Sequence, residues 1–167
     1  MKKVLVIGSN GSGKSTFANK LSRKIRLPLI HLDQHYWKPG WQRTSKEEWR
    51  TKVTRLLQKD SWIMDGNYQS SLDIRIPASD TIIWLDLNRF VCLWRVLKRK
   101  LLQDRVDKLN GCQERVDIHF IKWILWNYPR HDKPEIRRLI AKHKHKQIFV
   151  LKSQQNTKNL LDSLSNN

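Results

Sequence analysis

Residues 8–15 of the 167-residue sequence carry its clearest chemical signal. They read GSNGSGKS and fit the pattern G-x-x-x-x-G-K-[ST]. Glycines let the backbone approach an anion closely, and successive N–H groups form a concave anion site at the positive end of a helix. In such a loop Lys14 reaches the β- and γ-phosphates of ATP, and the Ser15 hydroxyl ligates Mg²⁺. The predicted nucleotide-binding residues are Gly8, Ser9, Asn10, Gly11, Ser12, Gly13, Lys14, Ser15 and Thr16.

The residues on either side of this loop supply the structural context that the motif requires. The β-branched run over residues 3–7 predicts a buried strand, and Phe17, Leu21 and Ile25 have the spacing of one helix face. A strand therefore enters the loop and a helix leaves it. The alternative, a Gly/Ser-rich turn that binds nothing, is disfavoured because the whole pattern and both flanks match.

Three aspartates follow predicted strands and could complete the site. Asp33, Asp65 and Asp86 each come directly after an apolar run. In open parallel sheets, ligands bind beyond the carboxyl ends of the strands, so we expect all three carboxylates at one crevice. Asp33 would orient or deprotonate a hydroxyl acceptor. Asp65 would hold magnesium through water, with Asp86 as the alternative for this role, although such residues also make turns or cap helices.

The order of the predicted elements specifies the fold class. Strands are predicted over residues 3–7, 29–32, 61–64, 81–85 and 147–151, and helices over residues 16–25, from 44, 88–103, 117–128, from 132, and 158–164. This alternation predicts an α/β protein, a three-layer P-loop NTPase fold with a five-stranded parallel sheet in a single domain over residues 1–167. Residues 34–41 are expected to form a loop. Thr44 and Glu47 are expected to form a capping box, and Pro129 to end the helix that Asp117 begins.

The net charge of the chain indicates which partners it can bind, and its cysteine content indicates its cellular compartment. The formal net charge is +18, and fifteen Lys/Arg against six Asp/Glu fall within residues 95–146. This balance favours anionic partners such as nucleotides or nucleic acid, although a solvated basic face is the alternative. Two cysteines make no disulfide framework, the N-terminal apolar run is too short for a signal peptide, and no stretch approaches the roughly 20 residues of a membrane span. We expect a cytoplasmic protein.

Several segments resemble the adenylate kinase-related P-loop kinases. Asp65-Gly66 after an apolar strand is similar to a motif of that family, as is Asp86 followed by a helix that carries Arg95 and Arg99. The resemblance implies that these arginines contact the nucleotide phosphates at the base of a mobile lid, here residues 104–116. Some lids of the wider family hold zinc with four cysteines, but this segment has only Cys112, so tetrahedral sulfur ligation is excluded.

Over nearly its whole length the chain resembles a narrower group, the bacterial "DNA topology modulation protein" family. The residues that carry this resemblance are 30–33, 37–41, 62–68, 92–99 and 111–112. One departure from adenylate kinases concerns the acceptor. Where those enzymes have Phe-Pro-Arg after Asp-Gly, this chain has Asn67-Tyr68-Gln69, which makes a nucleoside monophosphate acceptor doubtful. The segment Asp33 to Pro39 resembles instead the acceptor loop of uridine and nicotinamide riboside kinases.

These residues together predict the transfer of a phosphoryl group. Lys14 and the loop hold the donor, and Asp33 serves the acceptor. Arg95 and Arg99, four residues apart on one helix face, stabilise the transferring charge unless they belong to a solvated basic face. Trp37, Asn67 and Tyr68 would line the acceptor pocket, although aromatic residues more often belong to a core.

Three functions compete at this stage. The first is an ATP- and Mg²⁺-dependent small-molecule kinase, with an acceptor that could be nucleoside-like. The second is an ATP-responsive nucleic-acid-binding regulator of DNA topology, favoured by the net charge. The third is an NTP-binding protein with weak hydrolysis only. Asp33 and its aromatic loop favour the kinase, because a DNA-binding switch has no use for them. For a kinase, the basic charge predicts only weak, non-specific contact with nucleic acid.

Overall fold

The computed structural model describes residues 1–102, 111–112 and 116–164. At its centre lies a five-stranded sheet in which all four strand pairings are parallel. Its strands are, in spatial order, β2 (Leu29–His31), β5 (Trp62–Asp65), β1 (Lys3–Gly8), β6 (Thr81–Leu85) and β7 (Gln147–Leu151). The predicted α/β class and the predicted five-stranded parallel sheet are confirmed.

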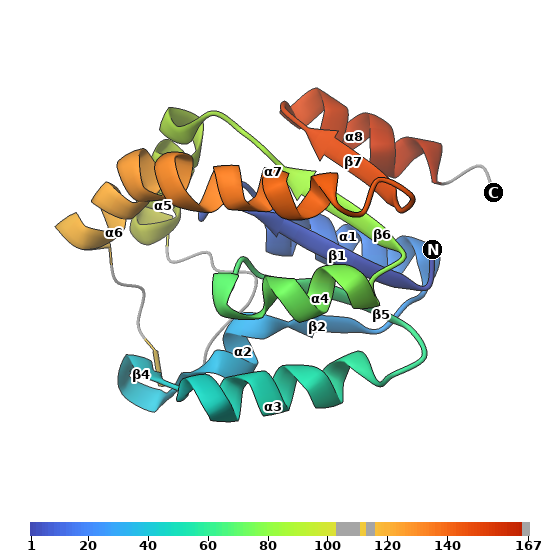
Figure 1. Ribbon diagram of the computed structural model, residues 1–167. Coiled ribbons are helices and arrows are strands. Elements are labelled where there is room, and N and C mark those ends of the chain that lie inside the picture. Colours follow the sequence, from blue (N-terminus) through green and yellow to red (C-terminus); the bar gives the residue numbers. More distant parts are fainter. Residues whose placement is uncertain (103–110, 113–115, 165–167) are drawn as a thin grey trace.

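Helices cover both faces of this sheet, because its strands carry apolar side chains on both sides. In β1, Val4 and Val6 pack against one helical layer, whereas Leu5 and Ile7 pack against the other. Figure 1 shows α1 behind the sheet and α4 and α7 in front of it. The first layer consists of α1 (Lys14–Ile25) and α8 (Gln154–Ser163), and the second of α3 (Lys46–Leu57), α4 (Leu72–Ala78) and α7 (Lys133–Ala141).

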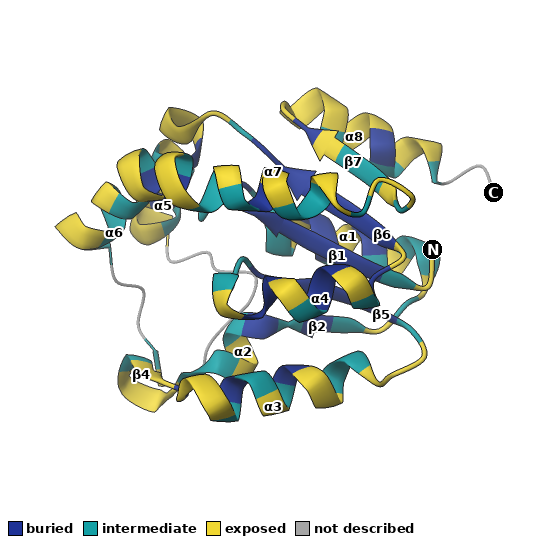
Figure 2. Ribbon diagram, viewed as in Figure 1, coloured by how far each residue is buried: buried dark blue, intermediate teal, exposed yellow. Residues whose placement is uncertain are grey.

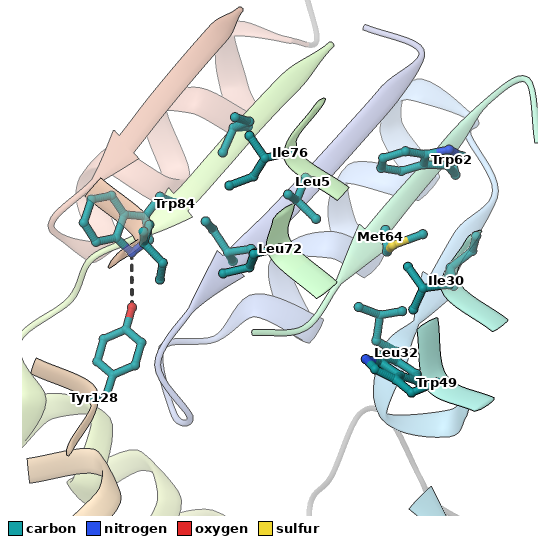
Figure 3. Close-up of a cluster of buried hydrophobic side chains, with 14 residues drawn as sticks. Leu5, Ile30, Leu32, Trp49, Trp62, Met64, Leu72, Ile76, Trp84 and Tyr128 are labelled. Carbon is teal, nitrogen blue, oxygen red and sulfur yellow. Dashed lines mark hydrogen bonds between the residues drawn. The ribbon is translucent and has the colours of Figure 1, made fainter. Parts of the chain in front are cut away.

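The larger part of the core lies under α3, α4 and α7 and is rich in aromatic residues (Figure 3). Trp49 and Trp62 are fully buried there, and the Trp84 indole N–H donates a hydrogen bond of 3.2 Å to the Tyr128 hydroxyl. Burying a large apolar side chain contributes roughly 1.5–3 kcal/mol. The dark central strands in Figure 2 show that this burial is concentrated in the sheet, which therefore forms a rigid platform for the loops at its edge.

The topology of the sheet defines where a ligand can bind. β1 lies in the middle of the sheet, the chain passes to β2 on one side of it, and it later crosses to β6 on the other side. In open α/β sheets, the crevice at such a reversal of strand order is the usual ligand site. The strand register aligns Val6 with Asp65 and Gly8 with Leu85, so β1, β5 and β6 end at the same edge.

The segment after β2 differs from the predicted loop. It forms a short helix and a two-stranded hairpin: α2 (Leu32–Tyr36), β3 (Trp37–Lys38), η1 (Pro39–Trp41) and β4 (Gln42–Arg43). The predicted capping box is displaced by one residue, because Ser45, not Thr44, accepts the hydrogen bond from the Glu48 N–H. Thr44 is buried, and its hydroxyl donates to the Tyr36 carbonyl, which closes the hairpin onto α2.

The predicted end of a helix at Pro129 is wrong. Asp117 does cap α6 (Ile118–Lys122), as expected, by accepting from the Phe120 N–H. The chain then continues through a π-helical segment, η3 (Trp123–Asp132), directly into α7. A π-helix bonds residues five apart, and this changed pattern accommodates the proline, which has no N–H to donate. Two further elements are η2 (Gln69–Ser71), which lies between β5 and α4, and α5 (Arg89–Leu102), which follows β6.

The predicted lid, residues 104–116, lies outside the described residues except at positions 111, 112 and 116. The Gly111 carbonyl accepts a hydrogen bond of 3.0 Å from the Gly40 N–H, at the tip of the β3–β4 hairpin. Within the part of the chain that the structure describes, no helix has both the length and the apolar character needed to cross a membrane.

Candidate active site

The loop between β1 and α1 has the backbone conformation that its glycines allow. Gly11 has φ +77°, and an added Cβ would lie 2.1 Å from the Cys92 carbonyl oxygen on α5. Gly13 has φ +89° and directly precedes α1, whose N-terminus has no side-chain cap. A residue with a side chain would be strained at both positions. The loop is thus pressed against α5 while the first N–H groups of α1 face the crevice.

The polar groups of this loop suit an anion. The hydroxyls of Ser9 and Ser12 are buried, and neither has a hydrogen-bond partner among the described residues. The Lys14 ammonium donates to the Ser9 carbonyl at 2.9 Å, which holds the cation over the loop. The first turn of α1 contains no acidic residue. Orphan donors, a cation and a helix N-terminus together form a place for phosphate.

Of the two predicted arginines on α5, Arg95 contacts the loop directly. Arg95 donates to the Ser12 carbonyl at 3.3 Å and to the Gln154 side chain at 2.9 Å, and Arg99 lines the same cleft. The opposite face of α5 is apolar and exposed, with Phe90 and Trp94 outward. Both arginines therefore lie on the side of α5 that lines the cleft, and not on its exposed apolar face.

Asp65 ends β5 beneath the loop, where a polar network holds it. Its carboxylate accepts from His31 Nδ1 at 2.7 Å, and His31 Nε2 lies 3.3 Å from the Asn19 amide nitrogen. The Asn19 amide also donates to the Ser15 carbonyl at 2.9 Å. Because an amide nitrogen only donates, His31 Nε2 must accept, and Nδ1 carries the proton that bonds to Asp65. This network fixes the Asp65 carboxylate relative to Ser15.

Asp33 lies at the other end of the cleft, in α2. The prediction that it ends the second strand is wrong, because β2 stops at His31 and Asp33 is the second residue of the helix that follows. Its carboxylate accepts a short hydrogen bond, 2.6 Å, from the Tyr68 hydroxyl. Burial and the Asp33 charge raise the pKa of Tyr68 above its ordinary value, so Tyr68 remains a donor at neutral pH.

Aromatic rings form the wall around Asp33. Tyr36 lies 4.5 Å from Tyr68 and 5.0 Å from Trp37, measured between ring centroids, and Trp37 lies 5.2 Å from Trp41. Their planes meet at angles of 43° to 89°, the tilted and edge-on arrangements that aromatic pairs prefer. All four rings line the cleft. The predicted pocket residues Trp37 and Tyr68 therefore lie beside Asp33.

The remaining predicted pocket residue, Asn67, faces a carboxylate that the sequence did not single out. Its amide nitrogen donates to the Asp132 carboxylate at 3.2 Å, and the Gln69 amide donates to the Asp132 backbone carbonyl at 3.3 Å. Asp132 is the last residue of η3 and lines the cleft. Burial raises its pKa to about 6. The only sequence signal at this position was the start of a helix.

Asp86 does not share the cleft, contrary to prediction. Its buried carboxylate pairs with the Lys133 ammonium at 2.7 Å and approaches Arg137 at 3.9 Å, and it is absent from the lining of the cleft. The pair connects the end of β6 to α7. Asp86 is the predicted alternative to Asp65 as a magnesium partner. Because Asp86 forms an ion pair with Lys133, Asp65 is the strand-end carboxylate that lies beneath the phosphate loop.

Two further features were not anticipated from the sequence. The start of α8 joins the site, since Gln154 bonds Arg95 and lines the cleft with Thr157 and Lys158. Arg75 is fully buried and donates to the carbonyls of Gly66 and Tyr68, which fixes the loop that presents Asn67. Neither residue belongs to a recognisable local pattern, and their partners lie far away in the sequence or in an irregular loop.

One continuous cleft of about 1790 Å³ is lined by the phosphate loop from Asn10 to Thr16, by Arg95 and Arg99, by Asp33, Asp65 and Asp132, and by the four aromatic rings. It extends from the start of α8, over the phosphate loop and Arg95, to the aromatic wall around Asp33. Single small-molecule pockets occupy roughly 300–1,000 Å³, so this cleft has room for two ligands side by side. Its cationic lining residues are Lys14, Lys20, Lys24, Arg43, Arg95, Arg99, Lys122 and Lys158. Such a lining attracts anionic ligands.

The chain matches no protein-family model, and no curated protein matches it in sequence. Solved structures do match its fold. A shikimate kinase from Aquifex aeolicus has a TM-score of 0.56 at 17% identity, covering 98% of this chain and 96% of that one. A protein of Chloroflexus aurantiacus described only as a candidate kinase has a TM-score of 0.56 at 16% identity, covering 99% and 98%.

A third similar structure is deoxyadenosine kinase from M. mycoides with bound dATP. Its TM-score is 0.54 at 13% identity, with coverage of 98% of this chain and 97% of that one. At these identities the likeness establishes the fold alone. The chain thus has the fold of P-loop kinases, in agreement with the predicted class. The resemblance to the "DNA topology modulation protein" family is not confirmed by any of these matches.

Proposed function

We propose that the protein is an ATP-dependent phosphotransferase that moves the γ-phosphate of ATP to a hydroxyl group of a small molecule. The observation that carries this proposal is the placement of Asp33 in the same cleft as the phosphate loop. A protein that only binds or slowly hydrolyses ATP needs no carboxylate surrounded by aromatic rings beyond the phosphates. A kinase needs one, to hold its acceptor hydroxyl.

The donor end would bind ATP through the phosphate loop. The N–H groups of residues 8–16, the Ser9 and Ser12 hydroxyls and Lys14 would hold the β- and γ-phosphates. The cleft continues over Gln154 and Lys158, which gives the sugar and base of the nucleotide a place beside Arg95. Arg95 and Arg99 would stabilise negative charge that spreads over the transferring group.

Magnesium fits the oxygen groups at the start of α1. The Ser15 hydroxyl would ligate it, and the Asp65 carboxylate, oriented by His31, would hold one of its waters. When bound, the ion neutralises charge on the β- and γ-phosphates. Carboxylate and hydroxyl oxygens are ligands that magnesium prefers, so the donor set agrees with this metal.

At the acceptor end, Asp33 would accept a hydrogen bond from the substrate hydroxyl. The hydroxyl oxygen then bonds to the γ-phosphorus, the bond from that phosphorus to the β-phosphate oxygen breaks, and ADP leaves. The hydroxyl proton passes to Asp33. Tyr68 keeps the Asp33 carboxylate in place by donating its hydroxyl proton to one of the two carboxylate oxygens, Oδ1. Trp37, Asn67 and Tyr68 would line the acceptor pocket, and rings of this kind suit a planar acceptor such as a nucleoside.

The structural neighbours support this proposal by their names, since they include kinases of shikimate and of deoxyadenosine. We further propose that the protein acts in the cytoplasm, because Cys92 and Cys112 are both free thiols.

The test is ATP consumption in the presence of individual nucleosides, nucleotides, sugars and hydroxylated vitamins. For the productive acceptor, Lys14→Ala should abolish both ATP binding and turnover. Asp33→Asn should keep ATP affinity near the wild-type value and slow transfer by roughly a hundredfold or more, the usual contribution of a positioned base. Asp60→Asn, an exposed aspartate in the turn before β5, serves as the matched control and should change neither quantity.

Two results would contradict the proposal. If ATP is consumed at the same slow rate whether or not any acceptor is present, the protein is an NTP-binding module with weak hydrolysis. If Asp33→Asn transfers phosphate at full rate per folded molecule, Asp33 is architectural, and the argument for an acceptor site is lost.

A further inference from the structure

Asp132 presents a further carboxylate in the cleft that contains the phosphate loop, and the proposed transfer step does not use it. Asp132 belongs to the π-helical turn at the junction of η3 and α7, and its side chain lines the same cleft as Asp33. π-helical turns of this kind occur frequently at functional sites, because they move one side chain out of the regular helical position. Asp132 is therefore placed by an irregular element and not by the regular face of a helix.

Positive charge is close to Asp132 in the sequence, at Arg130 and Lys133, and the protein as a whole carries +18. Even so, among the residues that the structure describes, no lysine or arginine forms an ion pair with its carboxylate, and the Lys133 ammonium pairs with Asp86 instead. Its polar contacts are with neutral amides, those of Asn67 and Gln69. Keeping a partly buried carboxylate ionised without a paired cation costs free energy, and the raised pKa of Asp132 agrees with that cost.

The hydrogen bonding of the neighbouring Asn67 amide is also incomplete. The Asn67 nitrogen faces Asp132, and the Asn67 amide oxygen is buried without a hydrogen-bond partner within the described residues. The Asp132 carboxylate and the Asn67 amide oxygen are both acceptors, and the described residues give neither of them a charged hydrogen-bond donor. Most buried acceptors in proteins are satisfied, so exceptions require an explanation. A ligand that brings N–H donors would supply one.

We propose that Asp132 binds the acceptor, and that this acceptor carries, besides its reacting hydroxyl, a nitrogen group that donates N–H bonds. The group is a protonated amine or the amidine-like edge of a ring. This inference rests on the proposed kinase function and names the class of its substrate. Asp33 would then bind the reacting hydroxyl of the acceptor, and Asp132 would bind its nitrogen group.

The experiment compares acceptors in matched pairs that differ in one nitrogen group. Glucosamine is measured against glucose, cytidine against uridine, and adenosine against inosine, with ATP and magnesium at saturation. The wild type should prefer the first member of the productive pair. Asp132→Asn should raise the KM for that member by about ten- to a hundredfold, the loss expected for a charge-assisted hydrogen bond, and should leave kcat and ATP affinity nearly unchanged. Glu135→Gln is the matched control: this half-buried carboxylate three residues away pairs with Arg138 and does not line the cleft, so the variant should leave the preference intact.

A stability measurement separates this role from a merely structural one. If Asp132 serves a ligand, Asp132→Asn should melt at a higher temperature than the wild type at pH 8, because it removes an uncompensated charge. A variant that melts several degrees lower would show that Asp132 holds Asn67 and Gln69 in place and would overturn the proposal. Equal use of both members of a productive pair, or the same preference in Asp132→Asn, would overturn it as well. Turnover with none of the wider set of hydroxyl compounds would instead refute the kinase function itself, and with it this inference.

Discussion

The hydrogen bond between Tyr68 and Asp33 gives a prediction that does not depend on knowing the acceptor. The two groups are 2.6 Å apart, and the acceptor is an ionised carboxylate. A bond of this charge-assisted kind contributes about 1.5–3 kcal/mol, roughly twice a neutral one. Tyr68→Phe deletes the donor and keeps the ring with its contacts to Tyr36 and Trp49. We expect the free energy of unfolding to fall by about 1.5–3 kcal/mol.

The assay is urea unfolding of Tyr68→Phe, Asp33→Asn and the double variant. If the hydroxyl acts through the charged carboxylate, the two effects should be non-additive, with an interaction energy of about 1 kcal/mol or more. Tyr128→Phe is a suitable control. The Tyr128 hydroxyl accepts a neutral hydrogen bond of 3.2 Å from the Trp84 indole, in another part of the core. Tyr128→Phe should therefore lower the free energy of unfolding by less than Tyr68→Phe does, and its effect should be additive with that of Asp33→Asn.

Additive effects of Tyr68→Phe and Asp33→Asn would refute the reasoning. They would mean that the hydroxyl is worth no more beside a carboxylate than beside an amide. The view that Tyr68 fixes Asp33 for an acceptor would then have no energetic support, even though the short distance remained.

Four other outcomes follow from the same structure. Gly11→Ala should abolish ATP binding in calorimetry, because its Cβ would lie 2.1 Å from the Cys92 carbonyl oxygen. Asp86→Asn should lower the free energy of unfolding in urea by about 1–3 kcal/mol, because Lys133 loses a buried partner, and should leave ATP affinity unchanged. DNA binding, followed by fluorescence anisotropy, should be weak, indifferent to sequence and steeply reduced by salt. Asp132 has a pKa of about 6, above its ordinary value, so between about pH 4 and 6 the folded state binds a proton that the unfolded state has lost. The free energy of unfolding of the wild type should therefore fall relative to that of Asp132→Asn as the pH rises through this range. Urea titrations should show a difference on the order of 1 kcal/mol.

The sequence by itself determined the features that depend on local pattern. The loop over residues 8–15 follows from glycine positions and from the strand and helix on either side. The five strands follow from short apolar runs, since both faces of the sheet are covered and every position in β1 from Val4 to Ile7 is buried. The fold class follows from their alternation with helices. In each case the determining residues lie within about a dozen positions, which is the range over which backbone preference and periodicity act.

Only the tertiary structure decided which side chains meet. Asp33, Asp65 and Asp86 look alike in the sequence, yet Asp86 is committed to Lys133, Asp65 to His31, and Asp33 to Tyr68. These partners are 34 to 47 positions away, and nothing in the local pattern distinguishes a carboxylate that will find a lysine from one that will face a cleft.

The irregular elements were likewise beyond local reasoning. Pro129 would normally end a helix, but packing of Tyr128 and Ile124 into the core holds the π-helical turn that carries the chain past it. That turn brings Asp132 beside Asn67, 65 positions earlier in the sequence. The geometry of the proposed acceptor end is therefore set by long-range packing, because a burial energy spread over many contacts overrides the preference of a single residue.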